Sequence, residues 1–254
     1  MNVTSASPAE GARADVAVPP QVLVWDAPVR VFHWLAVLCF FGAWITAESE
    51  RWRLLHVTLG YTLAGLVVFR LLWGLVGTRH ARFANFVRGP KAVGRYLASL
   101  VRGRPEHHTG HNPAGALAIV GLLALAALVT FSGWATYNEV WGEWTEDLHE
   151  GAANAMMALV LVHVAGVAVS SWMHRENLVA GMVSGHKPGT PADALRRRWR
   201  GLAALMLAAV LAFWWWQWRA PIGGAPLDDR AASVQRLEPS QEQGRRQRRR
   251  DHDD

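Results

Sequence analysis

The segment LHEGAANAMMALVLVHVAGVAVSSW, residues 148–172, decides the fold class of this chain of 254 residues. It carries two histidines, His149 and His163, and no charged residue after Glu150. A helix needs about 20 mostly apolar residues to cross the hydrocarbon core of a bilayer, because backbone polar groups find no water there. The segment therefore predicts a transmembrane helix that carries two ionisable rings.

Four more segments meet the same test of length and apolar character. They run over Val29–Ala47, Leu54–Gly77, Pro113–Thr136 and Leu202–Trp218. Hydrophobic residues make up 51% of the chain and lie in these long blocks rather than in short amphipathic periods. The sequence thus predicts an all-α membrane protein, with a four-helix bundle and a fifth transmembrane helix.

The charges are distributed unequally between the connections. Basic residues fill the second-to-third connection (Arg79, Arg82, Arg88, Lys91, Arg95, Arg102, Arg104) and the fourth-to-fifth connection (Arg175, Lys187, Arg196–Arg198). The third-to-fourth connection has Glu139, Glu143, Glu146 and Asp147 and no basic residue. The net charge of +6 therefore does not indicate nucleic acid, and the positive-inside rule places the N-terminus and both basic connections in the cytoplasm. Within the first of them, residues 90–101 predict an amphipathic helix that lies on the inner leaflet.

Four of the eleven histidines fall in apolar helical segments: His33, His56, His149 and His163. The last two are 14 residues apart, nearly four helical turns, so their rings share one face about 21 Å apart along the helix axis. Two ligands of one metal cannot be that distant, and we expect two separate cofactors. Because the first two predicted spans are antiparallel, His56 is level with His149, and His33 is closer in depth to His163.

Two neutral imidazoles fill both axial positions of a haem iron, and this leaves no open site for oxygen and favours electron transfer. The only cysteine, Cys39, lies inside the first span, which excludes the two-cysteine attachment of c-type haem. Any haem is therefore bound non-covalently. Arg70 and Arg30 are candidate partners of the haem propionates, with snorkelling to lipid headgroups as the alternative.

The other histidines fall in or beside the predicted loops and in the tail. They are His80, His107, His108, His111, His174, His186 and His252. We interpret those in the loops as solvated residues. A metal ion bound by His107, His108 and His111 remains the alternative.

Several short motifs resemble the bacterial cytochrome b561 family, which includes the b-type cytochrome subunits of nickel–iron hydrogenases. The matching stretches are Val24-Trp25-Asp26 through Arg30-Val31-Phe32-His33-Trp34, Leu55-His56 through Gly60-Tyr61, Arg70-Leu71-Leu72-Trp73-Gly74, Ala81-Arg82-Phe83, Gly110-His111-Asn112-Pro113, Leu148-His149-Glu150, His163 and Asn177-Leu178. The resemblance implies a four-helix bundle in the bacterial inner membrane with two haem b groups. Their axial ligands would fall on His33, His56, His149 and His163. It also implies electron transfer between the quinone pool and a redox partner: a periplasmic c-type cytochrome, a hydrogenase or another dehydrogenase.

This interpretation divides the chain into four parts. Residues 1–23 form a flexible cytoplasmic tail, 24–187 the di-haem membrane domain, 188–219 a basic linker with the fifth helix, and 220–254 a polar tail. Two other functions stay open at this stage. One is a membrane reductase acting directly on a small oxidant such as superoxide or ferric ion, and the other is a transporter lined by the four histidines.

Overall fold

The computed structural model describes residues 20–103, 106 and 109–219. Five of its helices are long and apolar enough to cross a membrane, as the sequence predicts. They are α1 (Ala27–Thr46), α2 (Arg53–Val76), α5 (Pro113–Tyr137), α6 (Trp144–His174) and α8 (Arg200–Arg219). The shorter elements are α3 (Phe83–Phe86), α4 (Pro90–Val101), α7 (Leu178–Ser184), the 3-10 helices η1 (Glu50–Trp52) and η2 (Pro191–Asp193), and the strands β1 (Gln21–Leu23) and β2 (His186–Pro188).

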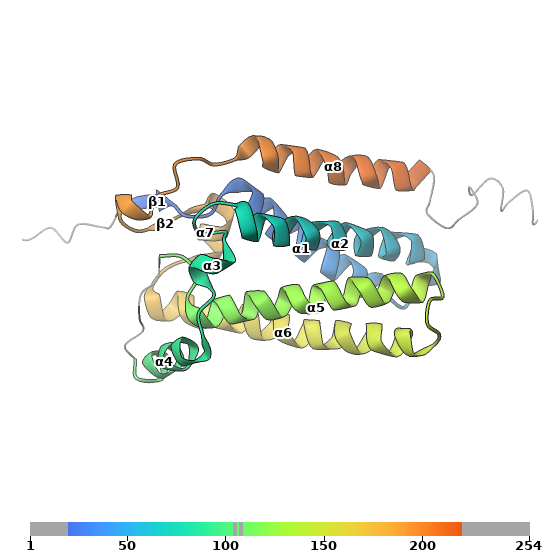
Figure 1. The fold of residues 1–254 in the computed structure, drawn as a ribbon, viewed down its shortest axis with the longest axis horizontal. Helices are drawn as coiled ribbons and strands as arrows, with labels where there is room; N and C mark the ends of the chain where they lie inside the picture. Colours follow the sequence, from blue (N-terminus) through green and yellow to red (C-terminus); the bar gives the residue numbers. More distant parts are fainter. Residues whose placement is uncertain (1–19, 104–105, 107–108, 220–254) are drawn as a thin grey trace, which may run out of the picture.

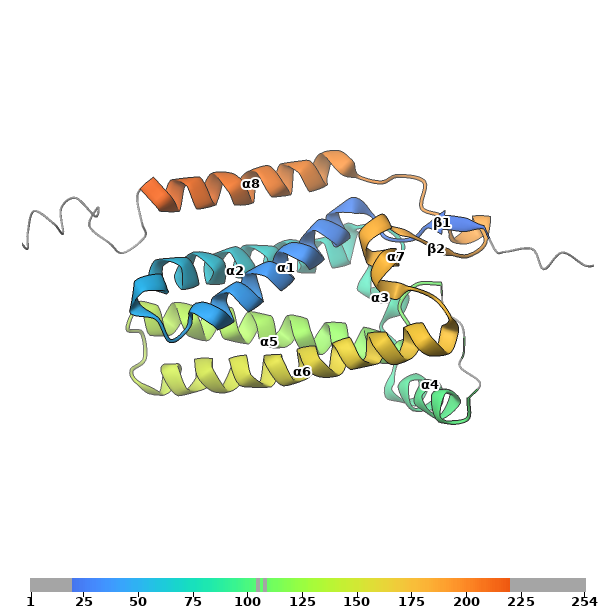
Figure 2. The same ribbon diagram turned by 180° about the vertical axis from the view of Figure 1, so that it is seen from behind.

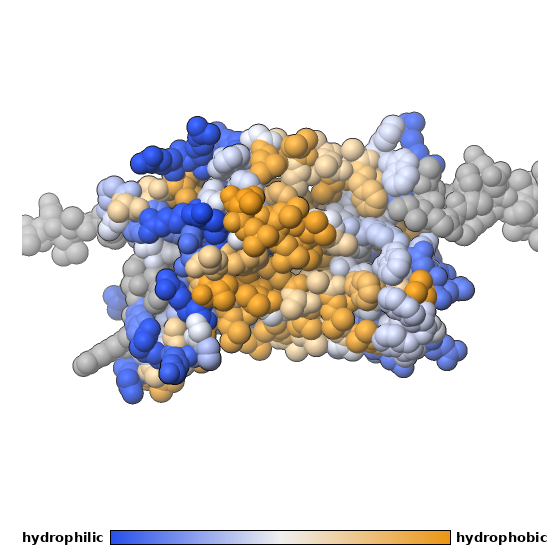
Figure 3. Space-filling model, in the orientation of Figure 1, coloured by the Kyte–Doolittle hydropathy of each residue, from blue (hydrophilic) through white to orange (hydrophobic). Residues whose placement is uncertain are grey.

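The long helices α1, α2, α5 and α6 form a four-helix bundle, and α8 lies along its side against α1 and α2 (Figures 1 and 2). Cys39, Phe40, Leu63 and Met156 belong to the buried core between these four helices. The space-filling view shows an apolar band across the middle of the molecule and hydrophilic surface at both ends (Figure 3). This pattern fits a protein that crosses a bilayer along the bundle axis.

One end of the bundle, called the basic end below, carries the short elements α3, α4, α7, β1 and β2 (Figure 1). There β1 pairs antiparallel with β2, with Leu23 opposite His186. We expected the flexible tail to include residues 21–23, but they form β1 because its partner strand returns from more than 160 residues later in the chain. Gly185, with φ of +86°, makes the tight turn before β2 and accepts hydrogen bonds from the backbone N–H groups of Val24 and Trp25.

Helix α1 starts at the basic end with Asp26 as its N-cap. The Asp26 carboxylate accepts a hydrogen bond from the backbone N–H of Val29 at 2.8 Å. It also accepts from Trp73 Nε1 at 3.1 Å and from the hydroxyl of Thr78. One buried carboxylate thus caps α1 and ties it to the end of α2, which fixes how far the two antiparallel helices slide along each other.

The fifth long helix contacts the bundle through its aromatic segment. The indole of Trp214 donates a hydrogen bond to Thr62 Oγ1 at 2.8 Å, and the Thr62 hydroxyl donates to the carbonyl of Thr58 on α2. Trp216 and Trp218 remain exposed, but Trp214 packs into the bundle because it meets a polar partner on α2.

Candidate functional site

Two histidines from different helices face each other at the end of the bundle opposite the basic end. The rings of His56 on α2 and His149 on α6 have centroids 6.2 Å apart and planes inclined by 81°. Two imidazoles that bind one metal from opposite sides, through bonds of about 2.0–2.1 Å, have centroids roughly 6 Å apart. The spacing of this outer pair is therefore that of a bis-histidine metal site.

The backbone holds both rings of the outer pair in one orientation. His56 Nδ1 lies 2.9 Å from the carbonyl oxygen of Ala43, and His149 Nδ1 lies 2.9 Å from that of Val129. An Nδ1–H that donates to a carbonyl leaves Nε2 as the neutral, metal-binding nitrogen. Both histidines thus have the second hydrogen bond that is typical of metal-ligating imidazoles.

A cavity of about 410 Å³ surrounds the outer pair, and α1, α2, α5 and α6 all line it. Its wall includes Gly60, where an added Cβ would meet no atom within 4 Å. Gly133 has the opposite role, because a Cβ there would lie 2.8 Å from the His149 ring. Glycine at 60 leaves space beside α2 for a flat ring, and glycine at 133 leaves space for the ligand itself. These residues fit a macrocyclic cofactor between the two histidines.

The second pair of histidines lies further toward the basic end. His33 on α1 interacts electrostatically with His163 on α6, just as His56 interacts with His149. The Nδ1 atom of His33 is buried and has no hydrogen-bond partner among the described residues. A Cβ added at Gly166, one turn after His163, would meet no atom within 4 Å. Open space beside this inner pair and an unpartnered buried nitrogen also fit a bound cofactor.

Helix α6 is continuous from Trp144 to His174 and therefore carries one histidine of each pair. The structure brings His56 and His149 together, as the depth argument from the sequence predicts. The pairing of His33 with His163 stays a prediction, which their electrostatic interaction supports. Along α6 the two sites are separated by 14 residues, or about 21 Å.

The two arginines expected to serve the cofactors have different environments. Arg70 is only 3% exposed, donates from Nη1 to the carbonyl of Ala81 at 3.2 Å, and lies 4.8 Å from the Phe83 ring centroid. It is enclosed by the segment that includes α3 and does not reach out to a headgroup. Arg30 donates from Nη1 to the carbonyl of Val183, and its buried Nε has no hydrogen-bond partner within the described part of the chain.

His111 is not the solvated loop residue that we expected. Its ring lies 4.4 Å from the ring of Trp25 and 4.4 Å from that of Phe86, and its buried Nδ1 lacks a hydrogen-bond partner among the described residues. Burial lowers the pKa of His111 to about 3, and the positive charges of Arg70 and Lys187 act in the same direction. The ring is therefore neutral near pH 7. Hydrophobic contacts from the β1 region and α3, distant in sequence, override its loop context.

The other loop histidines are only partly described. His80 is also half-buried, and its Nε2 contacts the carbonyl oxygen of Asp193 at 2.8 Å. The alternative metal site of His107, His108 and His111 cannot be followed, because the first two lie outside the described residues, as does His252.

Sequence reasoning also missed a buried ion pair near the inner site. Lys187 Nζ lies 3.3 Å from Glu176 Oε1, and both side chains are almost completely buried. Lys187 counts in the sequence as one more loop cation, whereas in the structure it pairs across α7, next to Gly181. The sequence gives one local indication of this arrangement, the Asn177-Leu178 motif. The Asn177 side-chain oxygen caps α7 by accepting a hydrogen bond from the backbone N–H of Ala180.

Comparison with known proteins adds independent information. A sequence model described as prokaryotic cytochrome b561 matches residues 24–185. The chain is 26% identical over 214 residues to a probable Ni/Fe-hydrogenase B-type cytochrome subunit of Bradyrhizobium diazoefficiens, covering 66% of this chain and 86% of the relative. A protein of the same description from Rhizobium leguminosarum bv. viciae is 26% identical over 228 residues, covering 70% and 94%. No solved structure matches the chain at a comparable level.

Proposed function

Since this chain belongs to the prokaryotic cytochrome b561 family and is thus a haem b electron-transfer protein of the membrane, we propose that it carries electrons between two haems stacked across the bilayer. His56 and His149 hold the outer haem, and His33 and His163 hold the inner one. The observation that carries the proposal is the outer pair, with its centroid spacing of 6.2 Å and both Nδ1 atoms next to backbone carbonyls.

Haem b supplies a one-electron couple at each site, and the protein supplies everything else. His56 and His149 would hold the iron of one haem and His33 and His163 that of the other, which would leave no site on either iron for an oxygen ligand. The carbonyls of Ala43 and Val129 fix the outer rings in one tautomer. The buried Arg70 guanidinium at the basic end would favour the anionic propionates and the reduced state of an inner haem.

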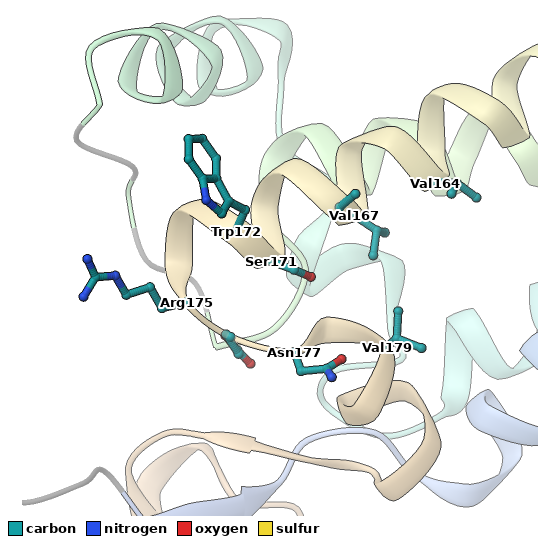
Figure 4. A pocket seen from close by; sticks show the side chains of 9 residues that line it. Val164, Val167, Ser171, Trp172, Arg175, Asn177 and Val179 are labelled. Carbon is teal, nitrogen blue, oxygen red and sulfur yellow. The ribbon is translucent and has the colours of Figure 1, made fainter.

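The inner site also has a suitable neighbour for a quinone. A groove of about 530 Å³ runs between the end of α6 and α7, starting at Val164, the residue after His163. Figure 4 shows its valine side, with Val164, Val167 and Val179, and its polar side, with Ser171 and Asn177. Glu176 lines the same groove and contacts Lys187. An apolar wall with polar groups at one end suits a lipid-soluble quinone whose ring exchanges electrons with the inner haem.

The second redox partner is proposed from the relatives, two of which are described above as cytochrome subunits of Ni/Fe-hydrogenases. We propose a hydrogenase, another dehydrogenase or a periplasmic c-type cytochrome that exchanges electrons with the outer haem. The acidic α5–α6 connection leads directly to this site, because Glu146 in the first turn of α6 lines the outer cavity. Direct reduction of a small oxidant remains the second function to exclude, whereas the family assignment does not favour a transporter.

The pairing of the ligands is tested with four single variants in a potentiometric titration followed by haem absorbance. His56→Ala and His149→Ala should each remove the same redox component, and His33→Ala and His163→Ala the other. His186→Ala, a half-buried histidine outside both pairs, serves as the control and should leave both components. If loss of His33 removes the component that depends on His149, the pairing is wrong.

The orientation is a separate proposal: the basic end faces the cytoplasm of a bacterial cell, and the membrane is the inner one. It rests on the basic residues around α3, α4 and α7 and on the acidic α5–α6 connection. A cysteine introduced at Ser99 should react with a membrane-impermeant thiol reagent only after the cells are opened. Labelling in intact spheroplasts would reverse the orientation.

A further inference from the structure

Helix α4 has a position that the electron-transfer function leaves unexplained. It lies off the side of α5 and α6 at the basic end, and its foreshortened coil in both ribbon views shows that its axis crosses those of the long helices (Figures 1 and 2). Tyr96, 1% exposed, is the buried residue of α4, and the helix packs against α5. In a bilayer that surrounds the bundle, α4 therefore lies beside the protein at the depth where the spans end.

Part of the apolar face of α4 has no covering within the described structure. Leu97 is 47% exposed and Val101 is 89% exposed, although Tyr96 beside them is buried. The exposed side chains of Lys91 and Arg102 lie at the two ends of the same helix, and Figure 3 shows apolar and strongly hydrophilic surface side by side over α4. Arg95 pairs with Glu106 at 3.4 Å, so within the described part of the chain the basic residues of α4 that form no ion pair are Lys91 and Arg102 at its ends. This is the pattern of a helix that rests on an anionic lipid surface.

Residues of α6 extend this surface. Trp172 is 80% exposed, and its indole points from the last turn of α6 to the side where α4 lies (Figure 4). Indole rings prefer the headgroup region because they combine an apolar body with one N–H donor. Arg175 follows as the C-cap of α6 and adds a cation at the same level.

We propose that α4 and Trp172 form an anchor for the anionic phospholipid headgroups of the leaflet at the basic end. Leu97 and Val101 enter the boundary between headgroups and acyl chains, and Lys91 and Arg102 bind phosphates. A membrane surface fits better than a protein partner, because the exposed apolar residues lie at headgroup depth next to cations. The anchor would also hold α3, which directly precedes α4, in place. Helix α3 contributes Phe83 and Phe86, which contact Arg70 and His111.

The test uses the purified full chain with haem in nanodiscs made of phosphatidylcholine alone or with phosphatidylglycerol. A nitroxide at Val101→Cys reports depth through its relative accessibility to oxygen and to a water-soluble nickel complex. Cys39 is completely buried and stays unlabelled. We expect the label in phosphatidylglycerol to be shielded from nickel, and K91E/R102E to restore its exposure. Each cation near an anionic surface favours docking about fivefold, so removing two should reduce the docked state at least about 25-fold.

The matched control is R196E/R197E, which changes the net charge equally on two exposed arginines of the linker before α8. It should leave the label shielded. The proposal is overturned if the nickel accessibility is high in both lipids, or if both double variants have the same effect. It is also overturned if dipolar broadening shows two labels close together, because α4 would then face a second copy of the chain. The label measures depth and not electron transfer, so failure here leaves the di-haem proposal standing.

Discussion

Gly133→Ala tests whether the outer site depends on the position of a single imidazole. The added methyl group would lie 2.8 Å from His149 Cε1 and 3.0 Å from Nδ1, whereas ordinary contacts begin near 3.4 Å. The ring must therefore move by roughly half an ångström. Because Nδ1 also lies 2.9 Å from the carbonyl oxygen of Val129, this movement weakens that hydrogen bond. Metal–ligand distances tolerate only about ±0.2 Å.

Overpacking of this kind costs about 1–3 kcal/mol, and loss of a bond that orients a metal ligand lowers affinity about 10–100-fold. We therefore expect Gly133→Ala to bind the outer haem about 10–100-fold more weakly and to leave the inner haem unchanged. The assay is titration of the haem-depleted protein with haem, followed by potentiometry. The component that disappears should be the one removed by His56→Ala.

Gly65→Ala is the matched control, because Gly65 lies exposed on α2 and an added Cβ there would meet no atom within 4 Å. It should keep both haems. Full occupancy of both sites in Gly133→Ala, with unchanged potentials, would refute the assignment of His149 as a rigidly held ligand.

Two further predictions concern the basic end. Asp26→Ala removes an N-cap and leaves Trp73 Nε1 and the Thr78 hydroxyl without their partner, so the free energy of unfolding, measured by denaturant unfolding in detergent, should fall by about 3–7 kcal/mol. Asp26→Asn keeps one oxygen acceptor and should lose less stability. Equal losses in the two variants would contradict the shared role of the carboxylate. The pKa of His111 is lowered to about 3, so between the ordinary pKa of about 6.5 and pH 3 the unfolded chain binds the extra proton and stability falls as the pH falls. The thermal midpoint of His111→Asn should therefore drop less than that of the unchanged protein between pH 7 and pH 5, and parallel curves would show that His111 becomes charged in the fold.

The sequence by itself determined the elements and the depth of the four histidines, because both follow from local periodicity. The apolar runs place the ends of the five long helices to within four residues, and α4 has the bounds that its amphipathic pattern predicts. The interval between His149 and His163 needs only the helical rise to imply two separate sites. Antiparallel neighbours then leave one pairing by depth, and the structure brings the rings of His56 and His149 together.

Only the tertiary structure decided which polar residues are enclosed at the basic end and which glycines make room for a ring. His111 and Lys187 lie in connections that look equally solvated in the sequence, and Arg70 lies within the second span, where the sequence also allows snorkelling to headgroups. They are enclosed because β1, α3 and α7, far apart along the chain, pack over them. Gly133 looks like any glycine of a membrane helix, and its importance comes from the His149 ring on the neighbouring helix. Hydropathy and spacing are properties of one segment, whereas burial and close approach depend on two, so no local pattern carries that information.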